Sequence, residues 1–523
     1  MIEEVEAILI ALLVAVAVLG AAARAVNIPY PIVLVVGGLG LGFVPGMPEV
    51  TLEPDLVLVI FLPPLLYSAA FFANLHDLRR DLRAITLQAV GLVLVTMCVV
   101  AVVAHALIPD LPWAAAFTLG AIVAPTDPLA ASEIARRMAV PRRIVSIVEG
   151  ESLINDGTAL VAYRVAVLAV GGTFSIWEAG LDFVSGAAIG IAIGLVAGAI
   201  ISEIRRMLDD VPVEITISLL TGYAAYLPAE ALHVSGVLAA VTAGIVLGWR
   251  APRISSARMR IQGFAVWETL VFLLNALLFV LIGLQLPSIL DGLSTRPAGE
   301  LLLWAVAVSA AVIVTRLVWG HTIVFVIRGL DRRASQQARR SSWQNRTVVA
   351  WSGMRGSVSL AAALALEPGF PARDEIQLLT FAVIFATLVL QGLTLPRVIR
   401  MLGVRDDGED AREELVGRRA AAAVALSRLD ELAEEEWTYD ETVERMRNLY
   451  RYRTRRFAAR AGESDEDGDS IEHRSRKYQK VARAVYDAQR DELVRLRNAG
   501  EISNEVMHRL ERELDLEDER LEI

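Results

Sequence analysis

The chain has 523 residues, of which 55% are hydrophobic, and its formal net charge is −10. A single cysteine, Cys98, excludes a disulfide framework and a cysteine-based metal site. The negative net charge argues against nucleic acid as a partner. Apolar windows of about 20 residues recur as far as residue 402, and each is long enough to cross a bilayer core as a helix.

These windows predict an all-α, multi-pass membrane protein with about 13 transmembrane helices. The first window begins with acidic residues and shows no cleavage site, so we expect a retained helix and not a signal peptide. The predicted spans cover residues 5–24, 29–46, 54–73, 84–108, 112–132, 147–170, 176–203, 212–230, 232–248, 263–286, 301–327, 347–366 and 376–396.

Arginines cluster in alternate loops, whereas the intervening loops carry only Arg296 and Arg373. Because basic loops stay in the cytoplasm, we expect an inner or plasma membrane location with the N-terminus outside and the C-terminus inside. We divide the chain into a transmembrane domain, residues 1–403, and a cytoplasmic helical tail, residues 404–523. The tail mixes dense charge with helically spaced apolar residues, which fits either a regulatory or dimerising domain or a solvated appendage.

The fifth span contains Pro125, Thr126, Asp127 and Pro128 in its second half. Proline removes a backbone donor and disfavours helical geometry in the residue before it, so the helix should break here. Carbonyl groups freed by the break, notably those of Ala121 and Ala124, would then offer oxygen ligands beside the Asp127 carboxylate. A broken helix that faces an ion site is a recurring feature of secondary transporters.

The sixth span adds three polar residues that helical spacing places on one face, Ser152, Asn155 and Asp156. Na⁺ is a hard cation that needs oxygen ligands when it leaves water, and these side chains supply a hydroxyl, an amide and a carboxylate oxygen. The sequence therefore predicts a Na⁺ site between the fifth and sixth spans. Glu151 points away from this face, so we expect it to have another role.

Arg355 in the twelfth span is the expected partner of Glu151, because an isolated guanidinium in the membrane is costly and a carboxylate pair is tolerable. We interpret this pair as a structural element that fixes helix register. The neighbouring Gly353 and Gly356 permit a second helix break or a close helix contact. Two interrupted spans in corresponding halves suggest inverted repeats, spans 1–6 and 8–13.

Other charged side chains in or near the spans are expected to reach the membrane interface, and we assign them no chemistry. They are Arg164, Glu178, Asp182, Glu214, Glu268, Arg316 and His321.

The segments "PTDP", "EGESLINDGTA" and "SGMRGSVSLA" resemble the bacterial NhaP-type Na⁺/H⁺ antiporters of the monovalent cation:proton antiporter-1 family. The resemblance implies that Asp156 is occupied alternately by Na⁺ and H⁺, while Ser152, the Thr126 backbone and Asp127 complete the metal site. It also implies a structural Glu151–Arg355 pair and a homodimer in which a six-helix core moves against a dimerisation domain. One departure is Ser68, which stands where many relatives have a glutamate.

We therefore expect a secondary transporter that exchanges Na⁺ for H⁺ by alternating access, for pH and sodium homeostasis, with no cofactor besides the transported ions. Asn155 stands in the place of a second aspartate, so one carboxylate would titrate per cycle and exchange would be electroneutral, one for one. Li⁺ and K⁺ could use the same oxygens, and a K⁺/H⁺ antiporter or a passive cation channel are the alternatives. An enzyme is not expected, because no metal-ligand histidine pair and no nucleophile with a base is evident.

Overall fold

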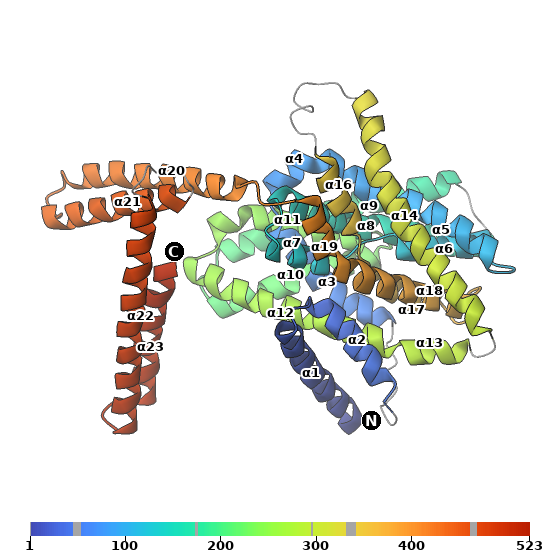
Figure 1. Ribbon diagram of the computed structural model, residues 1–523, viewed down its shortest axis with the longest axis horizontal. Coiled ribbons are helices and arrows are strands. Elements are labelled where there is room, and N and C mark those ends of the chain that lie inside the picture. The colour runs from blue at the N-terminus through green and yellow to red at the C-terminus, as the bar shows by residue number, and fades with distance from the viewer. Residues whose placement is uncertain are drawn as a thin grey trace. The chain divides into compact units, whose positions relative to one another are not determined.

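The computed structural model describes residues 2–44, 54–172, 176–293, 296–330, 341–460 and 468–522, and every regular element in them is a helix (Figure 1). The chain divides into two compact units, Met1–Asp406 and Asp407–Ile523, close to the boundary expected at residues 403 and 404.

The first unit contains helices made of long apolar segments, several of which are interrupted. In chain order they are α1 (Ile2–Ala25), α2 (Tyr30–Gly42), α3 (Pro54–Phe72), α4 (Leu75–Thr86), η1 (Leu87–Leu92), α5 (Val93–Leu107), α6 (Trp113–Val123), α7 (Leu129–Arg137), α8 (Arg142–Val170), α9 (Ile176–Arg206), α10 (Val211–Ala231), α11 (Gly236–Ile254), α12 (Ala257–Leu284), α13 (Leu286–Gly292), α14 (Ala298–Leu330), α16 (Trp343–Trp351), α17 (Ser357–Leu364), α18 (Arg373–Ala386), η2 (Thr387–Gln391) and α19 (Gly392–Leu402). The η elements are π-helical turns that join two α-helices end to end.

Seven of the described helices are long and apolar enough to cross a membrane, and four shorter apolar helices accompany them. Many large apolar side chains on these helices point outward, among them Leu168, Leu195 and Leu302, which are 69%, 50% and 66% exposed. An outer surface of this kind is stable against lipid tails, where every backbone group must be paired within its own helix. The all-helical membrane fold is thus confirmed, while the count of 13 spans stays a prediction.

Helix packing separates the first unit into two bundles. The scaffold bundle consists of α1, α2, α3, α9, α10, α11 and α12, and the site bundle consists of α4 to α8 with α14 and α16 to α19. Within the scaffold, α2 and α12 approach so closely that a Cβ atom at Gly38 or Gly283 would overlap the backbone of the other helix. Fewer contacts join the two bundles, mainly from α3, α11 and α12 to α8 and α17.

The second unit is a set of charged helices, α20 (Glu409–Leu432), α21 (Asp440–Arg460), α22 (Gly468–Asn498) and α23 (Asn504–Glu522). α20 packs on α21 and α22 packs on α23, and buried side chains such as Leu415, Leu429 and Phe457 line the first contact.

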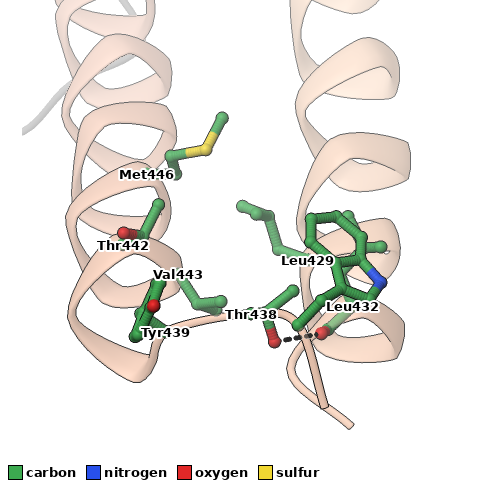
Figure 2. Close-up of a pocket in the computed structure, with 8 residues that line it drawn as sticks. Leu429, Leu432, Thr438, Tyr439, Thr442, Val443 and Met446 are labelled. Carbon is green, nitrogen blue, oxygen red and sulfur yellow. Dashed lines mark hydrogen bonds between the residues drawn. The ribbon is translucent and has the colours of Figure 1, made fainter. Parts of the chain in front are cut away.

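The turn between α20 and α21 encloses a small apolar pocket (Figure 2). The Thr438 hydroxyl in its wall donates a 2.7 Å hydrogen bond to the Leu432 carbonyl. The pocket has a volume of ≈ 200 Å³ and is lined by Leu429, Leu432, Trp437, Thr438, Tyr439, Thr442, Val443 and Met446. No charged side chain lines it, so it does not offer a cation site.

Candidate cation site

The first helix break lies between α6, which ends at Val123, and α7, which begins at Leu129. The five residues between them include Pro125 and Pro128, and each proline lacks the N–H that a continuous helix would need. Asp127 forms hydrogen bonds here through both its backbone and its side chain. Its N–H donates a 2.8 Å hydrogen bond to the Met354 carbonyl, and its Oδ1 accepts a 2.9 Å bond from the Leu129 N–H.

The second break lies between α16, which ends at Trp351, and α17, which begins at Ser357. The structure therefore brings the two interrupted segments together, since Met354 of the second bonds Asp127 of the first. The glycines of the second break face side chains at very short range. A Cβ atom at Gly356 would overlap the Asp127 carboxylate, and one at Gly353 would overlap the Arg316 side chain. Only glycine fits at these two positions without movement of the opposing group.

α8 brings its polar face to the first break, because it packs against α6, α7 and α17. Ser152, Asn155 and Asp156 on this face are 8%, 0% and 8% exposed. The Asn155 amide donates to the Thr126 hydroxyl over 2.9 Å. Asp127 lies close enough to Asp156 for the two carboxyl groups to interact electrostatically. All five residues predicted to bind the cation are thus neighbours across one junction.

Glu151 pairs with Arg316 of α14, so the predicted Glu151–Arg355 pair is wrong. Arg316 Nη1 and Nη2 each donate to one oxygen of the Glu151 carboxylate, the second over 2.8 Å, and both side chains are about 1% exposed. Arg316 also donates to the Ala350 and Val349 carbonyls, over 3.1 and 3.3 Å. The two-point geometry gives a buried carboxylate the charge neutralisation and the hydrogen bonds that it needs.

Arg355 instead holds the end of α6. Its Nε donates to the Val123 carbonyl over 3.0 Å, its Nη2 to the Ala124 carbonyl over 3.4 Å, and its Nη1 to the Gly353 carbonyl. A cation at a helix C-terminus satisfies carbonyls that have no intrahelical partner and offsets their partial negative charge. The Ala124 carbonyl, which was expected to be a free ligand, is therefore engaged by Arg355. The Arg355 N–H is in turn fixed by the Thr387 hydroxyl of η2, over 3.0 Å.

A hydrogen-bond chain runs from Arg316 to Asn155, and its direction follows from the chemistry of its members. An ionised Glu151 can only accept, so the Thr126 hydroxyl must donate to it, over 3.2 Å. Thr126 then accepts from the Asn155 NH₂ group, and the Asn155 Oδ1 is left buried without a hydrogen-bond partner in the described part of the chain. The chain fixes the orientation of the Asn155 amide.

The potential cation ligands at the junction are oxygen atoms. Across the described ranges, no protein group hydrogen-bonds the Asp156 carboxylate or the Ser152 hydroxyl, and no three His, Cys, Asp or Glu side chains gather as a metal-binding group. Two carboxylates with neutral hydroxyl and amide oxygens suit a hard cation of low charge. Ser68, the residue that departs from the pattern of many relatives, lies on α3. Its hydroxyl donates a 2.9 Å hydrogen bond to the Leu65 carbonyl.

Sequence reasoning missed Arg316, although a signal was present. Arg316 lies near the middle of a predicted span, residues 301–327, and is too far from either end for its side chain to reach the interface. An arginine at that depth requires a buried partner, and Glu151 was a carboxylate with no expected role in cation binding. The position of Arg316 within its span therefore favoured a buried carboxylate partner over an interfacial position.

Comparison with known proteins shows the family to which the chain belongs. The family described as "Sodium/hydrogen exchanger, transmembrane" matches residues 8–401. An uncharacterized Na⁺/H⁺ exchanger of Mycobacterium tuberculosis is 33% identical, over 98% of this chain and 96% of its own length. The Na⁺/H⁺ antiporter ApNhaP of Aphanothece halophytica is 36% identical, over 77% of this chain and 76% of its own.

The fold is also that of a solved antiporter. The sodium proton antiporter MjNhaP1 of Methanocaldococcus jannaschii superimposes with a TM-score of 0.60 at 21% identity, covering 77% of this chain and 99% of its own. The resemblance to NhaP-type antiporters is thereby confirmed. This chain is a member of the transmembrane sodium/hydrogen exchanger family.

Proposed function

We propose that this protein exchanges Na⁺ for H⁺ across the membrane and that the Asp156 carboxylate carries either ion in turn. The observation that supports this proposal is the junction of two broken helices with α8, where none of the described protein groups hydrogen-bonds the Asp156 carboxylate while Thr126, Asp127 and Asn155 are held by hydrogen bonds. Asp127, Ser152 and the Thr126 backbone complete the cation site, together with the Asn155 amide oxygen. The Ala121 carbonyl is a further ligand, because Pro125 has no N–H to occupy it.

Competition for one carboxylate couples the two fluxes. A bound proton or a bound Na⁺ each neutralises Asp156, and only the neutral state crosses the membrane at low electrostatic cost. Asn155 contributes no second charge, so each cycle moves one Na⁺ against one H⁺ and the exchange is electroneutral. In this mechanism, the site bundle moves against the scaffold bundle and exposes the site to each side alternately.

The proposal also covers the membrane orientation, the dimer and the role of the tail. The arginine-rich loops support a location in the cell membrane with the N-terminus outside and the tail in the cytoplasm. The scaffold bundle provides the homodimer interface, and the tail, residues 404–523, regulates exchange or strengthens the dimer.

Proton flux in proteoliposomes tests this proposal. The purified protein is reconstituted with a pH-sensitive dye inside acidic vesicles, and Na⁺, Li⁺ or K⁺ is added outside. We expect rapid alkalinisation by Na⁺ with wild type and none with Asp156→Asn, although the variant inserts equally. Cation flux that persists without any opposing proton flux would identify a passive channel and overturn the proposal. The order of rates among the three cations gives the selectivity.

A further inference from the structure

The helix that carries Asp156 is tied to the scaffold bundle by a polar contact located beyond the cation site. Arg164 lies eight residues after Asp156 on α8, about 12 Å further along the helix axis. Its Nη2 donates to Glu230 Oε2 over 2.6 Å, and its Nη1 to the Val234 carbonyl over 3.5 Å. Glu230 lies in the last turn of α10, and Val234 lies in the turn that leads to α11.

Glu230 is itself fixed in place by the scaffold. Its Oε1 accepts a 3.3 Å hydrogen bond from the N–H of Gly236, the first residue of α11. A Cβ atom at Gly236 would lie 2.8 Å from this oxygen, so glycine allows the carboxylate to reach the helix N-terminus. The N-terminal dipole of α11 also favours a negative charge here. The carboxylate that receives Arg164 is therefore positioned before Arg164 binds it.

In the described residues, α8 also contacts the scaffold through apolar side chains. Leu153 of α8 packs in one cluster with Leu62, Leu66, Tyr226 and Val237 of the scaffold. Apolar contacts are non-directional and keep much of their energy when two surfaces slide past each other. A two-point bond between a guanidinium and a preset carboxylate and carbonyl is directional, and it fits only one relative position of the helices.

We propose that the Arg164–Glu230 contact is a latch that holds the site bundle in one of its two transport positions and must open in every exchange cycle. This inference rests on the proposed function, since it requires α8 to move against the scaffold. Both side chains are partly exposed, 43% for Arg164 and 30% for Glu230, so the latch is weak enough to open repeatedly. An exposed pair of this kind shifts an equilibrium by about fivefold or less.

Covalent closure of the latch tests the inference in the full-length protein. On a Cys98→Ser background, Arg164→Cys and Glu230→Cys are introduced together and joined with a reducible bis-methanethiosulfonate reagent whose spacer matches the replaced side chains. Na⁺-driven proton flux is measured before linking, after linking and after reduction. We expect flux to fall at least tenfold on linking and to recover on reduction. Linked protein that transports at the unlinked rate would overturn the inference.

A matched control separates closure of the latch from cross-linking as such. Arg136 and Glu149 form a 2.8 Å ion pair within the site bundle, between α7 and α8. Linking Arg136→Cys to Glu149→Cys joins two elements that move together, so flux should change less than twofold. Flux by the Cys98→Ser parent tests the proposed function separately from the latch.

The neutral variants Arg164→Gln and Glu230→Gln cover the case in which the unlinked cysteine variant is inactive. Each variant removes the ion pair, so each should alter the exchange rate or the apparent Na⁺ affinity, and the double variant should alter it no further than a single one. Effects of the two single substitutions that simply add in the double variant would count against the latch.

Discussion

Removal of Glu151 should destabilise the protein because it leaves Arg316 as a buried, uncompensated charge. Glu151 and Arg316 are about 1% exposed and share two hydrogen bonds, and Arg355 adds a second positive charge close enough to repel Arg316. Breaking a buried pair by removing one partner costs about 3–5 kcal/mol. At about 1 °C per kcal/mol for a unit of this size, Glu151→Gln should lower the unfolding midpoint in detergent by about 3–6 °C.

A double-mutant cycle identifies the partner. If Arg316 is the partner, Glu151→Gln/Arg316→Gln should be less destabilised than the sum of its single variants, with a coupling energy of about 2–3 kcal/mol. The cycle with Arg355→Gln should give a clearly smaller coupling, because Arg355 bonds carbonyl groups and not the carboxylate. Thermal unfolding followed by the fluorescence of a thiol-independent dye measures both cycles. A larger coupling for Arg355 than for Arg316 would refute the assignment made from the structure.

Three further predictions concern the junction of the broken helices. Gly356→Ala should abolish exchange, because its Cβ would overlap the Asp127 carboxylate, whereas Gly299→Ala at an open helix position should leave exchange unchanged; wild-type flux in the first variant would contradict the packing described. Thr126→Val should lower the exchange rate at least tenfold, since it removes the hydrogen bond to Glu151 and leaves the Asn155 amide unpaired. Thr126→Ser keeps the hydroxyl and should keep most of the exchange rate. Equal exchange rates of the two variants would show that the hydroxyl is dispensable. Exchange by wild type should not respond to an imposed membrane potential, whereas a potential-dependent initial rate in leak-free vesicles would mean that more than the Asp156 charge moves per cycle.

Much of the fold could be predicted because its causes are local. Apolar windows fixed the helical membrane class, and the break before α7 follows from Pro125 and Pro128, whose effects act on adjacent residues. The shared face of Ser152, Asn155 and Asp156 follows from helical spacing alone. Each of these inferences needs only a few consecutive residues.

The pairing of charges could not be predicted in the same way, because it depends on which helices are neighbours. Glu151 could have met any buried arginine, and the choice of Arg316 is made by the packing of α14 against α16 and of α16 against α8. Arg355 was predicted to be an ion-pair partner, but it binds the carbonyl end of α6, a helix from another part of the chain. The sequence around Arg355 gives no sign of this second role. The latch residues Arg164 and Glu230 are likewise joined only by the tertiary fold.

The central claim is that Na⁺ and H⁺ compete for one carboxylate, and proton release on Na⁺ binding measures it most directly. Calorimetric titration of the purified protein with Na⁺ in buffers of different ionisation enthalpy gives the number of protons released per ion bound. At a pH where the free site is protonated, we predict a release that approaches one proton per Na⁺ for wild type, an apparent Na⁺ affinity that falls as the pH is lowered, and no Na⁺-linked release for Asp156→Asn. Na⁺ binding without proton release at every pH, or an unchanged release in Asp156→Asn, would contradict the account.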